Sequence, residues 1–392
     1  MSYGRNGEDK MRVLHIMSGF GGGISSFIQN KAIGLLDSDI IFDVATYDEV
    51  SPAFRNSIEQ MGGTIYPLIN PKKESWNAFV QSFDTIFHQH HYDVVHCHIV
   101  GYRAIAYYAI AKKYVSRFYI HAHDTRPMTQ TGLKNHLLHW FNRRLNHYMS
   151  DVALGCGDLA IQSHYGLVNK NHAMVLTNSI EDERFLMDDD QRLTLRQALR
   201  EQYHINDSTV VIGQVGRLEK VKNLSFTLNL ARYIKEQDLP AKIFLVGNGA
   251  LKESIQTTIE QEQLQSVIEL LGRHNQIEQL LPLFDVLLLP SFAEGLPTIA
   301  VEGQALGVPI LTSDNVTTEA DFGLGMFQQL SLDEKMNAWY VALEALAHEP
   351  VPVLSRRLEV LKGVKFTEAA SAELYQEFLL GEINHYHINP HS

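Results

Sequence analysis

Apolar segments of strand length alternate with amphipathic segments of helix length along nearly all of the 392 residues, and this alternation constrains the fold more than any other feature. A strand, a helix and a second strand in sequence build a parallel pair, because the helix returns the chain to the starting edge of the sheet. The expected strands are residues 13–17, 40–46, 64–67, 93–97, 118–121, 152–155 and 173–176, and then 210–215, 242–246, 267–270, 286–289 and 309–312. We therefore predict an α/β fold of two doubly wound, Rossmann-like domains that face a cleft.

A polar, charge-dense stretch from residue 180 to 208 interrupts the alternation. The expected organisation is a first domain over residues 1–185, a connection over 186–209, a second domain over 210–366, and a helix and tail over 367–392 that can cross back to the first domain. The run Asp188-Asp189-Asp190 lies inside the polar stretch and not at a strand end. We interpret it as a solvated charge run and expect no bound metal.

Composition argues against several classes of protein. The formal net charge of −12 disfavours sequence-independent nucleic-acid binding, which needs a basic surface. The two cysteines, Cys97 and Cys156, provide neither a disulfide framework nor a metal-binding spacing, which fits a reducing cytoplasm. No apolar run is long enough to span a bilayer. We expect a cytoplasmic protein that at most attaches to the inner face of the plasma membrane.

Two carboxylates follow the expected strand 286–289: Glu294 in a turn, and Glu302 eight residues later inside an apolar helix that we expect to begin near Pro297. A strand end opposite a helix N-terminus is where α/β proteins bind phosphorylated ligands, because free backbone N–H groups and the helix dipole favour negative charge. An unpaired carboxylate among apolar neighbours is costly, which favours a functional role for Glu302. The alternative is a solvated pair of glutamates beside an ordinary helix.

The first strand of the second domain ends in Gly216-Arg217 and is followed by Lys222. These residues stand at the C-terminal edge of the expected sheet, where ligands bind. An arginine fork with a lysine point charge suits a diphosphate. A solvated basic loop is the alternative, and it loses weight once Glu294 and Glu302 are placed on the same edge.

The first strand of the first domain runs into Gly21-Gly22-Gly23 and a helix for which Ser25 or Ser26 is the expected cap. Glycines there allow a ligand to approach the backbone closely. However, Ile24 stands where a dinucleotide fingerprint needs its third glycine. A tight turn and a binding loop are equally compatible with this segment.

Histidines lie at the expected ends of two further strands of the first domain. His98 follows residues 93–97, and His121 and His123 lie at and beyond the end of 118–121. Alternation along a strand sends His121 and His123 to the same side of the sheet. Packed and hydrogen-bonded histidines are the ordinary interpretation of such positions, and we favour it for His98.

The expected helix over residues 133–149 mixes apolar and aromatic residues with basic ones. The former are Leu137, Leu138, Trp140, Phe141, Leu145 and Tyr148, and the latter are Lys134, His136, His139, Arg143, Arg144 and His147. Such a helix suits docking on anionic lipid. A core helix with an exposed basic face is equally compatible with the pattern.

Taken in chain order, these segments resemble the motifs of retaining glycosyltransferases of the GT-B fold, in glycosyltransferase family four. The resemblance covers nearly the whole chain and is carried by Gly21 to Gly23, Asp93-Val-Val-His-Cys-His98, His121-Ala-His123-Asp124, Asn178-Ser-Ile-Glu with Phe185, Gly216-Arg217 with Lys222-Asn223, Gly247-Asn-Gly249 and Glu294-x7-Glu302. The chain departs from the family where it has Asn178-Ser179 in place of Asn-Gly and Glu294-Gly-Leu-Pro in place of Glu-Gly-Phe-Gly. The second departure bears on the fit around the donor sugar.

The resemblance implies roles for individual residues. Arg217 and Lys222 would hold the donor diphosphate, Glu294 would bind donor-sugar hydroxyls, and Glu302 would bind the ribose. His123 would lie beside the donor sugar, and His121 is the rival for this position, although alignment with the histidine at the strand end of the family favours His123. The implied catalytic set is His123, Glu294, Arg217 and Lys222. Further donor contacts are implied for Gly22, Gly23, Gly295, Leu296, Pro297 and Thr298. Among these, Pro297 has no backbone N–H to donate. Arg273 is implied as a contact to the base.

The activity that the resemblance implies is transfer of a hexosyl or N-acetylhexosaminyl group from a nucleotide-diphosphate sugar, with a UDP-sugar favoured. The implied acceptor is a glycan or an undecaprenyl-linked intermediate of bacterial exopolysaccharide or capsule biosynthesis, and neither a cofactor nor a metal is implied. Two alternatives stay open: a sugar-nucleotide epimerase of the same fold, and a non-catalytic partner subunit.

Overall fold

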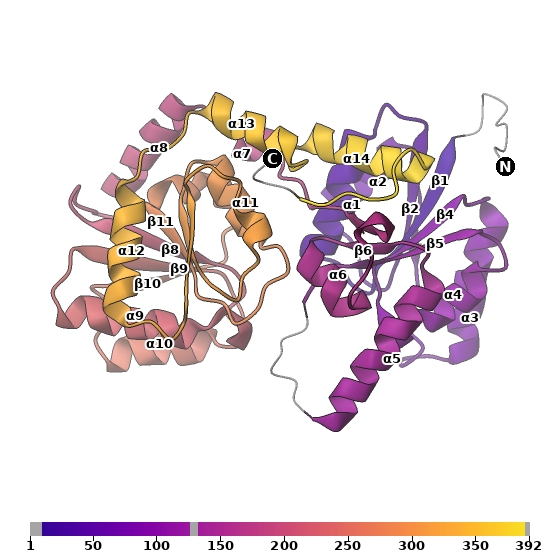
Figure 1. Cartoon of the computed structure of the whole chain (residues 1–392), viewed down its shortest axis with the longest axis horizontal. Helices are drawn as coiled ribbons and strands as arrows, with labels where there is room; N and C mark the ends of the chain where they lie inside the picture. The colour runs from indigo at the N-terminus through magenta and orange to yellow at the C-terminus, as the bar shows by residue number, and fades with distance from the viewer. Residues whose placement is uncertain (1–9, 126–131, 389–392) are drawn as a thin grey trace. The chain divides into compact units, whose positions relative to one another are not determined.

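The computed structural model describes residues 10–125 and 132–388, which divide into two compact units. Unit 1 contains the described residues up to Ser179 together with Lys365–Ile388, and unit 2 contains Ile180–Val364. Each unit is a parallel sheet flanked by helices (Figure 1). Burial on both faces explains why the strands are almost continuously apolar. The prediction of two doubly wound, Rossmann-like domains is confirmed.

The sheet of unit 1 has the strand order β3-β2-β1-β4-β5-β6-β7, and its strands are paired in parallel. The strands are β1 (Met11–Ile16), β2 (Ile40–Thr46), β3 (Ile65–Pro67), β4 (Val94–Cys97), β5 (Arg117–Ala122), β6 (Ala153–Gly155) and β7 (Ala173–Val175). The helices are α1 (Gly23–Gly34), α2 (Pro52–Gln60), α3 (Trp76–Gln89), η1 (Gly101–Ala104), α4 (Ile105–Ala111), α5 (Leu133–Met149), α6 (Asp158–Tyr165), η2 (Lys170–His172) and α14 (Glu368–Leu380).

The sheet of unit 2 has the order β10-β9-β8-β11-β12-β13 and is also parallel. The strands are β8 (Val210–Val215), β9 (Ala241–Val246), β10 (Ile268–Gly272), β11 (Val286–Leu289), β12 (Ile310–Ser313) and β13 (Phe327–Leu330). The helices are α7 (Asp182–Phe185), α8 (Asp189–Gln202), η3 (Lys220–Lys222), α9 (Leu224–Glu236), α10 (Lys252–Gln261), η4 (Ile277–Gln279), η5 (Leu281–Leu283), α11 (Thr298–Ala305), η6 (Thr318–Ala320), α12 (Met336–His348) and α13 (Leu354–Gly363).

In both units the strand order reverses beside the first strand. The reversal lies between β1 and β4 in unit 1 and between β8 and β11 in unit 2. Connections that leave neighbouring strands in opposite directions open a crevice at the carboxyl ends of those strands, which is the usual ligand position in open α/β sheets. We call these two places the unit 1 switch point and the unit 2 switch point.

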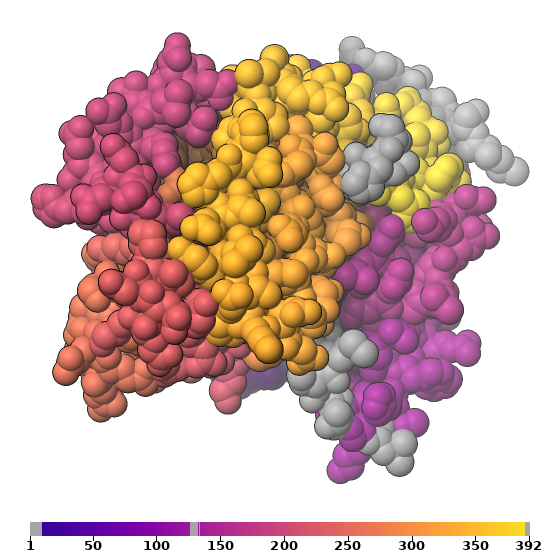
Figure 2. Space-filling model, turned by 60° about the vertical axis from the view of Figure 1, so that its left-hand side comes forward, coloured from indigo at the N-terminus to yellow at the C-terminus, as the bar shows by residue number. Residues whose placement is uncertain are grey.

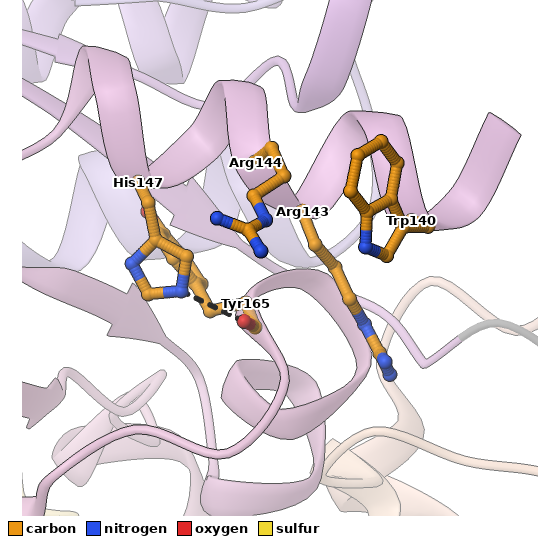
Figure 3. A pocket seen from close by; sticks show the side chains of 5 residues that line it. All are labelled: Trp140, Arg143, Arg144, His147 and Tyr165. Carbon is orange, nitrogen blue, oxygen red and sulfur yellow. Dashed lines mark hydrogen bonds between the residues drawn. The ribbon is translucent and has the colours of Figure 1, made fainter. Parts of the chain in front are cut away.

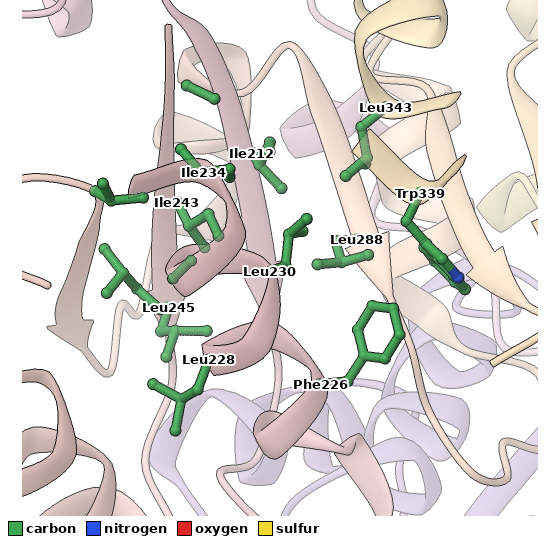
Figure 4. Close-up of a cluster of buried hydrophobic side chains, with 14 of the residues drawn as sticks. Ile212, Phe226, Leu228, Leu230, Ile234, Ile243, Leu245, Leu288, Trp339 and Leu343 are labelled. Atoms are coloured by element: carbon green, nitrogen blue, oxygen red, sulfur yellow. The ribbon is translucent and has the colours of Figure 1, made fainter. Parts of the chain in front are cut away.

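The core of unit 2 lies between its sheet and helices α9 and α12 (Figure 4). Leu230 of α9 and Leu343 of α12 meet Leu288 of β11 there. Trp339 is fully buried, and its indole N–H donates to the carbonyl of Ser331 at 3.1 Å, so the polar atom of this large side chain is satisfied. The outer side of α12 contributes to the amber surface in Figure 2.

The stretch that we expected to connect the domains differs in the structure. Helix α8 fills most of residues 186–209 and belongs to unit 2. Arg196 and Arg200 of α8 pair with Asp285, which also accepts a hydrogen bond from the backbone N–H of Val211 at 2.8 Å. The charge density of this stretch therefore fixes a helix onto unit 2, whose contact boundary lies after Ser179.

The aspartate run in this stretch is only partly a solvated charge run. Asp190 is exposed, as expected. Asp188, in contrast, caps α8 by accepting a hydrogen bond from the backbone N–H of Gln191 at 2.9 Å. Asp189 accepts a hydrogen bond at 2.5 Å from Arg357, whose side chain is fully buried. Two of the three carboxylates thus stabilise the fold of unit 2.

Helix α14 comes last among the helices but completes unit 1. It packs along α1 (Figure 1) and places Tyr375 and Phe378 in the same apolar core as Phe27. Beyond α14, Tyr386 forms a parallel bridge with Met174 of β7. The C-terminal helix is therefore part of the first sheet's core. Among the helices of the described residues, none is both long enough and apolar enough to cross a membrane.

Candidate active site

The unit 2 switch point holds an ion pair between Lys222 and Glu294. Lys222 Nζ donates to Glu294 Oε1 at 2.6 Å, and the two side chains are only 19% and 13% exposed. The residues are 72 positions apart, but β8 and β11 are neighbouring strands, so the loops that follow them meet. Both residues lie on the same edge of the sheet, as their strands led us to expect.

Further hydrogen bonds fix this pair. Ser291 Oγ donates to the same oxygen of Glu294 at 2.7 Å. On the other side, Gln214 Nε2 donates to the carbonyl of Lys222 at 2.9 Å, and Thr227 Oγ1 donates to Gln214 Oε1 at 2.5 Å. Because both partners are held from behind, an incoming ligand meets an ammonium and a carboxylate whose positions are already set.

Arg217 lies beside Lys222 but has a different partner. Together with Gly216, Arg217 and Lys222 line a small recess at the end of β8. Gly216 has φ 152°, and an added Cβ would lie 3.2 Å from Lys222 Cε, so a glycine lets the lysine pass close to the strand end. The Arg217 side chain is 77% exposed and pairs with Glu219 at 2.9 Å. An exposed pair of this kind is weak, so the guanidinium can turn to an anion at little cost.

Glu302 lies one turn into α11, among ionisable residues that sequence reasoning did not identify. Burial raises the pKa of Glu302 to about 7; Arg184 opposes the shift, and Glu181 and Glu278 add to it. Arg184 is itself paired with Glu278 at 2.5 Å and with Glu181 at 2.7 Å. A carboxyl group with this pKa is present in both protonation states near neutral pH, so it can accept or donate hydrogen bonds to a pair of hydroxyls.

The turn between Glu294 and α11 contains the other expected donor contacts. Helix α11 begins at Thr298, and Pro297 takes the cap position, one residue earlier than the first helical position that we expected for it. Gly295 and Leu296 are half-buried in the turn. No side chain of the described residues caps this helix, so its first backbone N–H groups are available to an anion. Arg273, the expected base contact, is exposed directly after β10.

Five histidines pack together at the unit 1 switch point. This histidine cluster consists of His15, His96, His98, His121 and His123. The rings lie on the sheet face that is covered by Phe27 of α1 and Tyr375 of α14. The rings of His121 and His123 have centroids 4.0 Å apart, which confirms that alternation sends both to one side. His121 is fully buried, whereas His123 is partly exposed.

Hydrogen bonds divide the histidine cluster into two rows. In the first row, His123 Nε2 is 2.7 Å from His98 Nδ1, and His98 Nε2 is 3.0 Å from His15 Nδ1. In the second row, the Tyr375 hydroxyl is 2.6 Å from His96 Nδ1, and His96 Nε2 is 3.1 Å from His121 Nδ1. His98 is thus bonded through both ring nitrogens, in line with its favoured interpretation as a packed, hydrogen-bonded histidine.

The histidine cluster is electrically neutral at physiological pH. Burial lowers the pKa of His15 to about 3, with His123 adding to the shift. Burial likewise lowers the pKa of His123 to about 3, against the opposing charge of Asp124. Burial and mutual repulsion lower the pKa values of the other three histidines well below the ordinary range. Even the nearby Lys31 has a pKa lowered to about 7 by burial.

The described residues that could hold a metal ion are also in this cluster. Two groups, His15 with His96 and His98, and His98 with His121 and His123, bring ring nitrogens within 4.8 Å of one another. Most of the ring nitrogens are engaged in hydrogen bonds, however, and a divalent ion would bring its full charge into a buried neutral cluster, which is costly. The hydrogen-bonded rows account for the geometry without an ion.

The glycine-rich loop at the same switch point needs its glycines. Gly21 and Gly22 have φ of 104° and 75°, a region that other residues rarely adopt. The expected serine cap is wrong: α1 begins at Gly23 with Gly22 as its cap residue. Ser25 lies in the first turn and accepts a hydrogen bond from the N–H of Gly21 at 3.1 Å. An added Cβ at Gly23 would lie 3.0 Å from Asn178 Nδ2, so the loop packs against the Asn178 segment.

Helix α5 exposes most of its side chains, both apolar and basic. The residues that it buries against unit 1 include the polar Asn142 and Asn146, which accept hydrogen bonds from the backbone N–H groups of Tyr102 and Gly101. Its large apolar residues are exposed: Leu137, Leu138, Trp140, Phe141 and Tyr148. Residues of α5 lie at the surface, in magenta at the lower right of Figure 2. The basic residues Lys134, Arg144 and His147 are exposed as well, so α5 presents apolar and basic side chains together.

A cavity of about 320 Å³ lies beside α5 and is lined by Trp140, Arg143, Arg144, His147 and Tyr165 (Figure 3). Arg144 lies over the Trp140 ring, 5.3 Å from its centroid. Arg143 has a structural role, since its Nε donates to the carbonyl of Ser163 at 3.1 Å near the end of α6. His147 Nε2 lies 2.8 Å from the carbonyl of Tyr165. The cations Arg144 and, further along, the exposed Lys134 remain at the surface.

Besides Arg184 and Glu278, the sequence analysis did not identify Ser291, His15 and Tyr375 as site residues. Ser291 lies only three positions before Glu294, and serine near a functional carboxylate was the available signal. His15 stands in β1 opposite His96 in β4, a register that the strand order 2-1-4 would have revealed. Tyr375 comes from α14, far away in sequence, and no local pattern links it to His96.

Comparison with known proteins assigns the chain to a family. The family model described as glycosyl transferases group 1 matches residues 196–322, within unit 2. EpsF of Bacillus subtilis strain 168, a protein assigned as a glycosyltransferase, is 31% identical over 349 residues, which cover 88% of this chain and 90% of EpsF. An Escherichia coli UDP-Gal:alpha-D-GlcNAc-diphosphoundecaprenol alpha-1,3-galactosyltransferase is 31% identical over 138 residues, 33% of this chain and 36% of that enzyme.

Solved structures agree on the fold. Anabaena HepE, solved in complex with UDP and glucose, aligns with a TM-score of 0.72 at 13% identity, over 94% of this chain and 99% of HepE. This likeness concerns the fold, whereas the similarity to EpsF extends over the sequence of both units. The chain therefore belongs to the group 1 glycosyltransferases and has their GT-B fold.

Proposed function

We propose that this glycosyltransferase moves a hexosyl or N-acetylhexosaminyl group, with retention of configuration, from a UDP-sugar to a lipid-linked or glycan acceptor in the assembly of a bacterial cell-surface polysaccharide. The observation that carries the donor assignment is the Lys222–Glu294 pair at the unit 2 switch point. Group 1 membership supplies the reaction class, and the pair supplies groups of the charge that a sugar diphosphate requires.

Lys222 is the main cation for the donor diphosphate. In the free protein its charge is balanced by Glu294, which prevents an unpaired ammonium at a largely buried position. A bound diphosphate replaces that partner and leaves Glu294 to accept hydrogen bonds from sugar hydroxyls. Arg217 adds a second cation once it leaves Glu219. Both cations gain strength as negative charge develops on the leaving nucleotide, so they favour the transition state over the bound donor.

The remaining donor contacts come from α11 and the turns around it. The open N–H groups at the start of α11 suit the sugar-proximal phosphate, and Glu302 suits the ribose hydroxyls. Arg273 is our candidate for the base. In unit 1, we propose Gly22 and Gly23 as contacts for the phosphates and the acceptor, and His123 as a contact for the donor sugar.

Proton transfer needs no residue with a matched pKa. We infer that the donor phosphate takes the acceptor proton as the new bond forms on the same face of the sugar, which gives retention. The neutral histidine cluster supports this, since its rings are poor bases at physiological pH. Since cations of the protein balance the diphosphate, we propose that transfer is independent of a metal ion and of a cofactor.

The acceptor is proposed to be lipid-linked and met at the cytoplasmic face of a membrane. The name of the Escherichia coli relative specifies a diphosphoundecaprenol acceptor, and the exposed apolar and basic residues of α5 suit an anionic lipid surface. The described part of α5 carries no acidic residue, so nothing on the helix itself opposes this attraction. The overall charge of −12 makes the local clustering of cations decisive.

Donor identity is tested by a panel of nucleotide sugars with different bases and sugars. A true donor at 100 times its Kd stabilises the fold by about 2.7 kcal/mol, which is visible as a thermal shift. Slow release of free sugar, with the nucleotide diphosphate as the other product, identifies the donor before the acceptor is known. Accumulation of an epimerised nucleotide sugar would show an epimerase, and no shift with any member would refute the donor site.

A further inference from the structure

The first row of the histidine cluster has two unsatisfied ends. The row joins His123 Nε2 to His98 Nδ1 and His98 Nε2 to His15 Nδ1. His123 Nδ1 and His15 Nε2 are buried, and neither has a hydrogen-bond partner among residues 10–125 and 132–388. An unpaired buried ring nitrogen is costly, so such a position points to a partner that binds during function. His121 Nε2, at the end of the second row, is likewise buried without a partner among the described residues. Of these three histidines only His123 is partly exposed as a residue, so its end of the first row is the one nearest the surface.

The hydrogen atoms of each row can be arranged in two directions. Each neutral imidazole carries one N–H, so the first row can direct its N–H groups either all toward His15 or all toward His123. Both arrangements make the same two hydrogen bonds. In the second row, the Tyr375 hydroxyl can donate to His96 Nδ1 or accept from it, so this row can also run in either direction. The rows differ at their ends: the second row begins at a phenol, whereas the first begins and ends at imidazoles.

The direction of the first row decides what His123 offers. When the N–H groups point toward His15, His123 Nδ1 is a bare acceptor. When they point toward His123, its Nδ1 carries the N–H and donates. A sugar hydroxyl can donate or accept, so either form is able to bind it.

We propose that His98 and His15 are positioning residues for His123: they hold its ring through Nε2, so that Nδ1 is presented to a hydroxyl of the sugar substrate as donor or acceptor. The inference rests on the proposed function, in which His123 contacts the donor sugar. In this proposal the hydrogen bonds between the ring nitrogens hold His123 in place, and the volume that the rings fill is not what matters.

Amide substitutions separate contact from volume at His98. An asparagine amide occupies the place of a histidine Nδ1, and a glutamine amide reaches the place of Nε2. His98→Asn therefore keeps the contact with His123 and loses the one with His15, whereas His98→Gln does the reverse. A packing role predicts the opposite ranking, since asparagine leaves the larger cavity.

The expected result is that His98→Asn has an intermediate kcat, because it keeps the contact with His123 and loses the one with His15, while His98→Gln and His98→Phe lose about a hundredfold, the usual cost of a misplaced reacting group. The donor KM should change little in all three, because the diphosphate site lies in unit 2. Equal losses in the two amide variants, or a greater loss in His98→Asn, would overturn the proposal.

A second pair guards against misfolding of the His98 variants. His15 bonds His98 through Nδ1, so His15→Asn should keep kcat closer to wild type than His15→Gln does. The matched readout that does not depend on turnover is the ¹⁵N spectrum of the imidazole groups. His98→Gln should shift the His123 Nε2 resonance to that of an unbonded nitrogen, and His98→Asn should not.

These measurements distinguish two kinds of failure. If no nucleotide sugar supports transfer but the ¹⁵N shifts follow the expected order, the proposed function fails and the positioning of His123 stands. If transfer occurs and the His123 resonance is unchanged in His98→Gln, the proposed function stands and the positioning role is refuted. Full activity of His123→Ala would refute the positioning role as well, because nothing would remain to be positioned.

Discussion

The unit 1 switch point is filled with buried, neutral imidazoles, whereas the unit 2 switch point holds an ammonium and a carboxylate 2.6 Å apart. The sheets are alike: both are parallel and both reverse direction beside their first strand. The difference therefore lies in the side chains that the same architecture presents. In unit 1 burial keeps the polar groups uncharged, and in unit 2 pairing keeps them charged.

This contrast teaches how one fold can serve two substrate chemistries. A diphosphate needs compensating cations, and the cations must be stored with a partner while the site is empty. A sugar hydroxyl needs a precise hydrogen bond, and a neutral ring provides it without attracting stray ions. If this division is right, changes in the two units should affect different kinetic and thermodynamic quantities.

The largest effect is expected at the charged site. Lys222→Ala should lower kcat/KM by about a thousandfold, as does loss of a major electrostatic contact to a transition state. Lys220→Ala is the matched control, because Lys220 is an exposed lysine of the same short helix η3. Steady-state transfer with the identified donor measures both. Similar losses in the two variants would mean that general positive charge, and not the stored pair, binds the diphosphate.

At the neutral site, His123→Ala should lower kcat by about a hundredfold, the lower range for loss of a positioned catalytic side chain. His121→Ala should cost clearly less, since His121 is fully buried in the other row. The affinity of both variants for the nucleotide, measured by calorimetry, should equal that of the wild type. A greater loss of kcat in His121→Ala would contradict this assignment, because His121 and not His123 would then contact the sugar.

The surface of unit 1 offers a test that does not involve either switch point. Lys134→Gln combined with Arg144→Gln should weaken binding to phosphatidylglycerol-rich vesicles by about 30-fold, since each surface cation contributes ~1 kcal/mol. Arg143 is left unchanged because it caps α6. Sedimentation with vesicles measures binding, which should also fall as salt rises.

The control for this experiment is Lys335→Gln combined with Lys362→Gln, which removes the same charge from exposed positions of unit 2. Vesicle binding by this control should equal that of wild type. A loss as large as in the α5 variant would show that net charge governs the interaction and that α5 is not the docking surface.

The smallest effect is a difference in pH dependence between the units. The histidine cluster has folded-state pKa values below the unfolded value, so it stabilises unit 1 fully above about pH 6.5, and that stabilisation is lost as the pH falls toward 3. Each such histidine changes the slope by about 1.4 kcal/mol per pH unit. His15→Asn should reduce the slope by about that amount, measured by hydrogen exchange of the β1 and β4 amides.

Unit 2 should respond in the opposite direction at one residue. The folded-state pKa of Glu302 is raised to about 7, so its burial costs stability as the pH rises from about 4.5 to 7. Glu302→Gln should therefore stabilise the amides of β11 at pH 8 and leave them unchanged at pH 4. If the stability of both units changed with pH in the same direction in these variants, the proposed electrostatic difference between the units would be wrong.

Much of the fold was readable from the sequence because parallel strands buried on both faces are continuous apolar runs. The expected strands 40–46, 210–215 and 286–289 coincide with β2, β8 and β11 to the residue. Strand β13 was missed because it has only four residues, Phe327–Leu330, and the two at its centre are polar glutamines. So short a segment shows no apolar run. Helix α8 was missed because docking by arginines leaves no apolar stripe.

The candidate sites were predictable only in part. Adjacency of β8 and β11 follows from the doubly wound pattern, so placing Lys222 and Glu294 on one edge required no coordinates. Their direct contact could not be predicted, because it depends on loop conformations set by the bonds of Ser291 and Gln214. The contact between Tyr375 and His96 could not be predicted either, because the two residues are 279 positions apart in the sequence.

The position of α14 has a consequence for biosynthesis. Unit 1 is built from both ends of the chain, so the ribosome must make all of residues 180–364 before the helix that closes the first core can emerge. At ~5–20 residues per second, that interval lasts on the order of ten to forty seconds. During this time the nascent first sheet exposes the face that α14 later covers, while unit 2, which is continuous in sequence, can finish folding. Unit 2 can therefore fold completely before unit 1, although its synthesis begins later. A chaperone that recognises apolar surface has the longest time to bind the uncovered sheet of unit 1.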